Sequence, residues 1–221
     1  MHVTGTGSGE WQSFAELTQG NSRLVVHCLV VQPDALYQAL RKTIDQDSKA
    51  RINMNITLRN EQPADIDSIA RLTEAAFKNQ EHSSHTEHFI VNALRKANQL
   101  SVSLVAVEDG EIIGHVALSP VTVSSGATGW YGLGPISVHP ERQGQGIGSS
   151  LMNAALAQLQ RLGGAGCVLL GDPGYYGRFG FKTYPGLELP GVPPEYFQAL
   201  SFRDVAPTGV VKYHDAFEAT A

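Results

Sequence analysis

The stretch from Gly132 to Gly148 constrains the fold of this chain more than any other part of the sequence. It begins with a short apolar run that contains the β-branched residues Ile136 and Val138, which is typical of a strand. His139-Pro140 ends that run, because proline has no backbone N–H and restricts the residue before it. A glycine-rich turn and an amphipathic pattern come next. The stretch therefore predicts a strand, a turn and a helix in succession.

The three glycines of this turn alternate, at positions 144, 146 and 148. A glycine turn that leads into a helix leaves backbone N–H groups unpaired beside the positive end of the helix dipole, and such a turn binds phosphate. No lysine follows the glycines, which excludes a nucleoside-triphosphate loop. Ser149 replaces the third glycine of a dinucleotide fingerprint, and no acidic residue lies between Glu141 and Asp172, which excludes that loop too.

Composition limits the partners and the compartment. The 221 residues are 42% hydrophobic and 17% charged, with a net charge of −5, so no basic field attracts nucleic acid. Cys28 and Cys167 lie far apart in apolar runs, which favours a reducing compartment over a disulfide framework. The sequence has neither an apolar run of transmembrane length nor the pattern of a signal peptide. We expect a cytoplasmic protein that binds neither membrane nor nucleic acid.

The first 53 residues differ in character from the rest. Met1–Gly20 is rich in Gly, Ser and Thr and is expected to be a loose arm. Leu24–Val31 predicts a strand and Asp34–Ile44 a short helix, a unit too small to bury its own core. An extension and a functional module are both open interpretations. The predicted organisation is an N-terminal extension (1–53) whose order and function stay open, a domain (54–217) and a tail (218–221).

The remaining pattern predicts an α/β fold, an α+β mixed sheet. An Asp109-Gly110 turn joins two strands as a hairpin. Apolar residues at helical spacing indicate helices over 63–77, 86–98 and 147–162. Strands are expected over 55–59, 102–108, 112–123, 130–138 and 167–171, from 180 onward, and as a terminal pair over 196–200 and 209–213. This order favours a central twisted mixed sheet with helices on both faces.

Two motifs carry a resemblance to a known family. Gln143-Gly144-Gln145-Gly146-Ile147-Gly148 fits the pattern Gln/Arg-x-x-Gly-x-Gly/Ala and resembles the acetyl-CoA pyrophosphate loop of the GNAT superfamily of N-acetyltransferases, in its bacterial predicted-acyltransferase branch. One helix and one strand later, Tyr176, Arg178, Gly180 and Phe181 resemble the family's Tyr-x-Arg/Lys-x-Gly-Phe segment. The resemblance covers about residues 55–217 and implies a GNAT-like acyl-CoA N-acyltransferase fold.

The resemblance also implies a site for acetyl-CoA, the co-substrate. Its pantetheine arm is expected along a strand that splays from its neighbour, and Gly134-Pro135 is expected to break the ladder there. A backbone N–H of this strand is expected to polarise the thioester carbonyl. The implied pyrophosphate-binding residues are Gln143, Gly144, Gln145, Gly146, Ile147 and Gly148, and the implied pantetheine-binding residues are Ile136, Ser137 and Val138.

The implied activity is transfer of an acetyl group to a primary amine of a small molecule or a peptide. Tyr176 is expected to be the general acid that protonates the departing CoA thiolate, with Tyr175 as a packing residue. Cys167 has no neighbouring cation or His in sequence to activate it, which favours direct transfer in a ternary complex over an acyl-enzyme. Homodimerisation is common in the family and is possible here.

The general base and the acceptor are not readable from the sequence. The strand Trp130–Val138 lacks the Glu that many family members carry there. The candidates are Glu81, His82, His85 and His115, and water-mediated deprotonation is equally open. Because of the missing carboxylate, a non-catalytic acyl-CoA-binding module stays an alternative, as does a transferase for longer acyl groups.

The histidines of this region also suggest a metal site. His82, His85 and His88 are three apart, with Glu81 and Glu87 beside them. That spacing makes one ligand face only in a helix, and Ser83-Ser84 argues against a helix. We therefore predict no metal.

Overall fold

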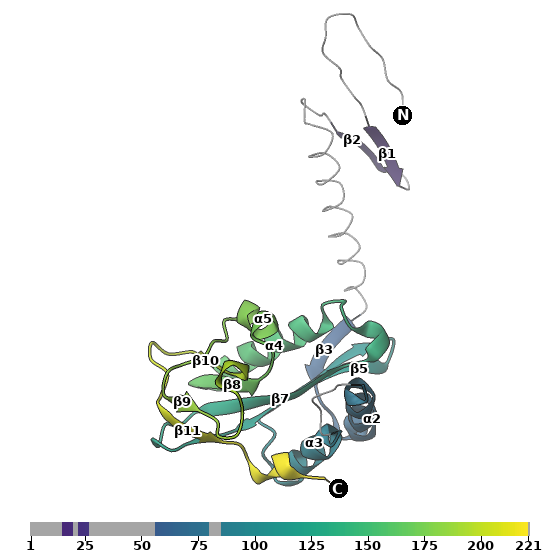
Figure 1. The fold of residues 1–221 in the computed structure, drawn as a ribbon. Helices are drawn as coiled ribbons and strands as arrows, with labels where there is room; N and C mark the ends of the chain where they lie inside the picture. The colour runs from purple at the N-terminus through teal and green to yellow at the C-terminus, as the bar shows by residue number, and fades with distance from the viewer. Residues whose placement is uncertain (1–14, 20–21, 27–55, 80–84, 221) are drawn as a thin grey trace, which may run out of the picture. The chain divides into compact units, whose positions relative to one another are not determined.

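The computed structural model describes residues 15–19, 22–26, 56–79 and 85–220 (Figure 1). The chain divides into two units, Met1–Met54 and Asn55–Ala221.

The first unit contains an antiparallel hairpin in which β1 (Ala15–Gln19) pairs with β2 (Ser22–Val26). The expectation of a loose arm as far as Gly20 is therefore wrong for β1. The polar composition of this segment does not show that it pairs with β2, which follows it in the chain. The predicted strand is present in part, as β2. Its residues 27–31 and the predicted helix over 34–44 lie outside the described residues.

A six-stranded mixed sheet forms the centre of the second unit, in the order β10-β8-β7-β5-β4-β3 (Figure 1). β7 and β8 are parallel, and the other neighbours are antiparallel. The strands are β3 (Ile56–Asn60), β4 (Val102–Glu108), β5 (Glu111–Pro120), β7 (Trp130–Val138), β8 (Gly166–Leu170) and β10 (Phe197–Ser201).

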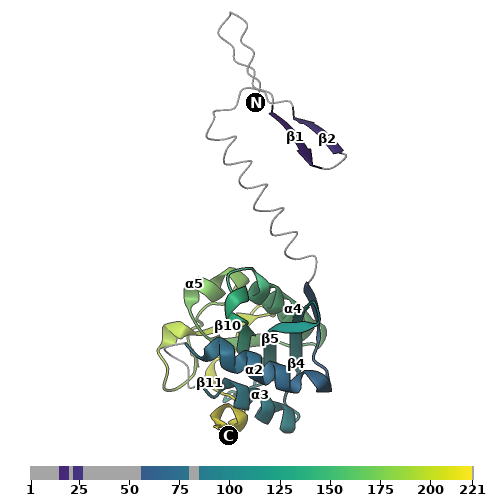
Figure 2. The same cartoon turned by 90° about the vertical axis from the view of Figure 1, so that its right-hand side faces the viewer.

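Helices cover both faces of this sheet (Figures 1 and 2). α2 (Ile66–Phe77) and α3 (Glu87–Lys96) lie on one face, and α4 (Ile147–Arg161) lies on the other. The short helix α5 (Pro173–Tyr176) follows β8. Single 3₁₀ turns cover Pro63–Asp65, Pro140–Arg142, Gly177–Phe179, Pro194–Tyr196 and Asp215–Glu218.

The alternation of side chains along β5 shows why the two faces differ. A Cβ at Gly114 would lie 2.9 Å from the Leu151 side chain, so this position allows α4 to approach the sheet closely. The next residue, His115, faces the other way and pairs with Ser137, whose hydroxyl donates to Thr73 of α2 at 3.3 Å. The α4 face is apolar, and the α2 face contains buried polar groups.

The C-terminal strands differ from the prediction. β10 and β11 (Gly209–Lys212) do not pair with each other. β10 joins the central sheet beside β8, whereas β11 joins a small sheet with β6 (Thr122–Val123) and β9 (Leu187–Glu188). The strand predicted from residue 180 is reduced to one bridge between Lys182 and Ala199. The prediction assumed that strands adjacent in sequence pair with each other, whereas β10 and β11 each pair with strands that lie far away in the sequence.

Replacing Gly132 by alanine should destabilise the fold, because a Cβ there would overlap the half-buried ring of Tyr213. We expect a loss of about 1–3 kcal/mol in the free energy of unfolding. Gly177→Ala is the matched control, since it has open space and a φ of −55°. Urea unfolding measures both variants. If the two variants are equally stable, the Tyr213 ring does not exclude a side chain at residue 132.

Candidate functional site

The turn before α4 requires glycine at two positions. Gly144 and Gly146 have φ values of 75° and 85°, a left-handed conformation that strains residues with a side chain. A Cβ at either position would meet nothing within 4 Å, so the reason for glycine is conformation and not crowding. Gly148 differs. A Cβ there would lie 3.1 Å from the hydroxyl of Tyr175, so glycine permits that close approach.

Side chains of the turn bind back onto the turn itself. Gln143 donates from Nε2 to the carbonyl of Val138 at 3.1 Å, and Gln145 donates to the carbonyl of Glu141 at 3.1 Å. Arg142 is paired with Glu108 of β4. These contacts hold the turn against the ends of β4 and β7.

The start of α4 carries backbone N–H groups that make no hydrogen bond within the helix. The amide of Ser150 bonds the carbonyl of Gly146 at 3.0 Å. The amides of residues 147–149 precede that bond and have no partner within the helix. They lie at the positive end of the α4 dipole, beside the exposed glycines 144 and 146. The turn and the first helical residues therefore form a concentration of N–H donors suited to an anion.

β7 has a free edge next to this turn. Its parallel pairing with β8 ends at Gly132 opposite Val168, although β7 continues to Val138. The register between β7 and β5 shifts at Gly134-Pro135, where β7 has the extra residue of a β-bulge. The predicted break in the ladder is therefore present.

The direction of the β7 backbone groups follows from one hydrogen bond. The amide of His139 bonds the carbonyl of Ile113 on β5 at 2.9 Å. Backbone groups alternate along a strand, so those of Ile136 and Val138 face the edge that β8 has left, and those of Ser137 face β5. The hydroxyl of Ser137 is also buried against α2. Two of the three predicted pantetheine-binding residues therefore face the free edge.

A cavity of about 920 Å³ opens along this edge of β7. Six segments meet there: the ends of α2 and α3, the second half of β7, the turn before α4, the β8–α5 region and the C-terminal segment. The described residues that line it are Ala76, Phe77, Asn79, Glu87, Ile90, Leu133, Gly134, Pro135, Ile136, Val138, Gln143, Leu170, Tyr176, Tyr213 and Phe217.

Tyr176 borders the cavity from α5. Its ring packs so closely on Gly171 that a Cβ there would overlap it, and it lies edge-on to Phe181 at 6.3 Å. Burial, with a smaller contribution from Tyr175, raises the pKa of Tyr176 to about 12. The phenol is therefore protonated at neutral pH. Tyr175, by contrast, packs against Gly148 and beneath the guanidinium of Arg178.

Comparison with known proteins gives the family. Residues 66–181 match the model of the acetyltransferase (GNAT) family. A GNAT family acetyltransferase from Brucella melitensis, solved in complex with acetyl-CoA, is 50% identical with a TM-score of 0.66, covering 73% of this chain and 97% of that one. This chain belongs to the GNAT family of acetyltransferases.

An Escherichia coli relative agrees. The N-acetyltransferase YhbS of strain K12 is 36% identical over 168 residues, which are 72% of this chain and 97% of that protein. The crystal structure of YhbS in complex with CoA gives a TM-score of 0.69 at 34% identity, covering 76% of this chain and 94% of the other. The predicted family, fold class and acyltransferase class are confirmed.

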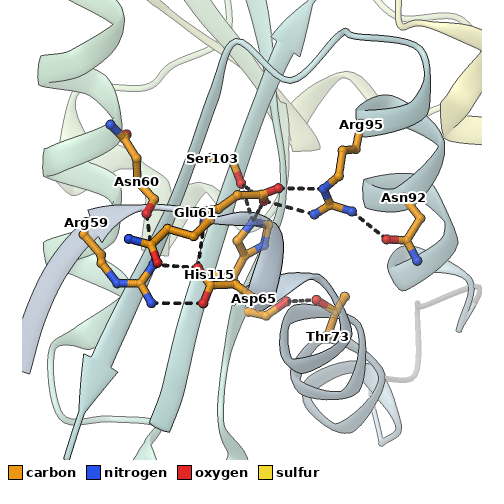
Figure 3. Close-up of polar contacts among 11 residues, drawn as sticks. Arg59, Asn60, Glu61, Asp65, Thr73, Asn92, Arg95, Ser103 and His115 are labelled. Atoms are coloured by element: carbon orange, nitrogen blue, oxygen red, sulfur yellow. Dashed lines mark hydrogen bonds and ion pairs between the residues drawn. The ribbon is translucent and has the colours of Figure 1, made fainter. Parts of the chain in front are cut away.

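One candidate base of this GNAT chain, His115, lies outside the residues that line the cavity. It is buried in a polar cluster with Glu61, Arg95 and Ser103 between β3, β4, β5 and α3 (Figure 3). Its Nε2 is 2.9 Å from the hydroxyl of Ser103. Burial lowers the pKa of His115 to about 4, despite the attraction of the Glu61 carboxylate. His115 is therefore a neutral member of a structural cluster.

The other candidate bases are placed only in part. Glu81 and His82 lie outside the described residues. His85 has a φ of 60°, and its Nδ1 lies 3.1 Å from the carbonyl of Phe77. It borders a smaller pocket of about 360 Å³ beside α2, with Glu74 among the lining residues.

The described residues contain no group of three or more metal-ligating side chains. Within the same residues, no helix is both long and apolar enough to cross a membrane.

Glu87, Tyr213 and Phe217 are among the cavity-lining residues that the sequence did not predict. Glu87, the first residue of α3, was considered only as a metal ligand. Tyr213 and Phe217 come from the C-terminal segment, where only a strand pair and a tail were predicted. An acidic residue in the first turn of the helix after the loop was the available signal for Glu87. The two aromatics gave none, because long-range packing places them.

Replacing His115 by asparagine should flatten the pH dependence of stability between pH 6.5 and 4. The imidazole binds its proton near pH 4 in the folded chain and near pH 6.5 in the unfolded chain. The contribution of His115 to the free energy of unfolding of the wild type is therefore full above pH 6.5. It falls by up to about 3 kcal/mol as the pH drops to 4. Urea unfolding across this range measures the difference. A changed pH profile of turnover would instead return His115 to the mechanism.

Proposed function

We propose that this GNAT-family chain transfers the acetyl group of acetyl-CoA directly to a primary amine in a ternary complex. One observation carries the proposal: Gln143 at the start of the donor-rich turn, Ile136 and Val138 on the free edge of β7, and Tyr176 all line a single cavity. The Brucella melitensis relative, which was solved with acetyl-CoA, supports this choice of donor.

In this proposal the cofactor lies across the turn and the strand. The amides of residues 143–148 bind the pyrophosphate, since both left-handed glycines and the α4 dipole favour an anion there. The pantetheine arm hydrogen-bonds to the backbone of Ile136 and Val138 along the free edge. The Val138 carbonyl accepts a bond from Gln143 in this structure, so Gln143 must move if pantetheine takes that position.

The chemical step needs one proton donor and one proton acceptor. The amine nitrogen attacks the carbonyl carbon of the thioester, a C–N bond forms and the C–S bond breaks. A backbone N–H at the free edge stabilises the oxyanion. Tyr176 gives its phenolic proton to the CoA sulfur and recovers one of the protons that the nitrogen loses. With a pKa of about 12 the phenol is protonated at neutral pH and therefore has a proton to give to the sulfur.

An acyl-enzyme route has little support from the described residues. Cys167 is fully buried in β8, and burial raises the pKa of its thiol well above the usual range. A thiol of that kind is a poor nucleophile. We place the transferase activity in residues 54–217 and leave the first 53 residues as an extension without a part in the chemistry.

A non-catalytic acyl-CoA-binding module is the second candidate. It is favoured by the absence of any carboxylate from Trp130–Val138, the strand that borders the cavity. Such a module would bind acetyl-CoA through the same backbone groups and release it unchanged.

Kinetics with acetyl-CoA and a panel of primary amines should give turnover with intersecting initial-velocity lines. Both substrates must be bound together when transfer is direct, which produces this pattern. Release of free CoA, followed with a thiol reagent, measures the rate. Parallel lines would indicate an acyl-enzyme, and saturable binding without turnover would favour the module.

Tyr176→Phe should lower kcat by about 10²- to 10⁴-fold and change the affinity for acetyl-CoA by less than threefold. The ring and its packing on Gly171 remain, and only the proton donor is lost. Tyr196→Phe is the matched control, because Tyr196 is 47% exposed and lies outside the cavity. Unchanged turnover in Tyr176→Phe would remove this residue from the mechanism.

A further inference from the structure

We propose that the ion pair between Glu108 and Arg142 positions the glycine turn for acetyl-CoA, and that neither side chain contacts the cofactor. The inference rests on the proposed function, in which the turn of residues 143–148 binds the pyrophosphate. Both positioning residues lie outside the glycine motif and outside the described lining of the cavity.

Glu108 is the fixed partner of the pair. It is the last residue of β4, and its backbone is in register with Ile56 of β3 and Glu111 of β5, so the sheet holds it from both sides. Arg142 ends the 3₁₀ turn that follows β7, and its Nη2 pairs with Oε2 of Glu108. The side chains of Arg142 and Glu108 are 35% and 15% exposed, so solvent screens them less than it screens a fully exposed pair. The pair therefore joins the start of the glycine turn to a rigid strand.

The guanidinium of Arg142 also contacts the middle of the turn. Its Nη1 donates to the side-chain oxygen of Gln145 at 3.4 Å, and Gln145 donates from Nε2 to the carbonyl of Glu141 at 3.1 Å. Gln145 lies between Gly144 and Gly146, which both have left-handed backbone. Glycine has more backbone freedom to lose than any other residue, so ordering this turn upon binding costs free energy. Contacts that order Gln145 before the cofactor arrives lower that cost.

Direct binding of phosphate by Arg142 is the alternative role, and the contacts of Arg142 oppose it. A carboxylate oxygen pairs with Nη2, and an amide oxygen accepts from Nη1. Glu108 also neutralises the charge that would attract an anion. The two roles predict opposite effects of removing the Glu108 charge. A freed Arg142 would attract the pyrophosphate and tighten the binding of acetyl-CoA, whereas a turn that has lost its attachment to β4 binds acetyl-CoA more weakly.

The test measures the dissociation constant of acetyl-CoA by calorimetry for the full wild-type chain, Glu108→Gln, Arg142→Gln and the double variant. Glu111→Gln is the matched control, because Glu111 is exposed, lies opposite Glu108 in the hairpin and loses the same charge. The thermal midpoint of each variant is measured as well. The kcat is measured at saturating acetyl-CoA with a primary amine that the wild type acetylates.

We expect each single variant to raise the dissociation constant of acetyl-CoA by roughly fivefold. The double variant should raise it no further, because both changes break the same pair. The kcat should change by less than about twofold, since the turn is filled at saturation. The thermal midpoint should fall by less than about 4 °C. Glu111→Gln should bind acetyl-CoA no more weakly than wild type does.

Tighter binding of acetyl-CoA by Glu108→Gln would overturn the inference and make Arg142 a phosphate ligand. Additive losses in the double variant would also overturn it, because the two residues would then act separately. Unchanged affinity in both single variants, or a larger fall in the thermal midpoint, would do the same. If the wild type binds no acetyl-CoA, the proposed function itself is refuted.

Discussion

The candidate site depends on the point at which β7 and β8 stop pairing. Their ladder ends at Gly132 and Val168, and the bulge at Gly134-Pro135 follows at once. If pairing continued, β8 would satisfy the backbone groups that Ile136 and Val138 now turn toward the cavity. β8 is instead held from its other side by β10, along its whole length from Gly166 to Leu170. The sheet therefore stays intact while one internal edge opens.

A half-buried polar cluster holds α3, which forms part of the cavity wall. Glu61 receives hydrogen bonds from Arg95 and Ser103, and Ser103 also contacts His115. Burial acts to raise the pKa of Glu61, but the bonds from Arg95 and Ser103 outweigh it, and the pKa is lowered. This ion pair is only half-buried, and these bonds offset the cost of its partial desolvation. Its effect here is to fix α3 on the sheet, and α3 carries part of the cavity wall.

The parts of the fold that were predictable have a local cause. The left-handed backbone of the turn requires Gly144 and Gly146, and an apolar stripe at helical spacing marks α4. The sequence therefore predicted both features. The partners of β10 and β11 were not visible, because short C-terminal strands fit several edges equally well. The same holds for the site. Tyr176 and the turn belong to motifs, whereas Glu87 and Phe217 reach the cavity through tertiary packing.

This difference separates the two halves of the site physically. The proposed donor half consists mainly of N–H and C=O groups, which every residue carries, so its requirement is conformational and falls on a few glycines. The proposed acceptor half consists of side chains from α2, α3 and the C-terminal segment. A change in the turn before α4 would affect every acceptor alike, because it alters how the common donor is held. A change on α3 would alter which acceptor is used and leave the donor in place.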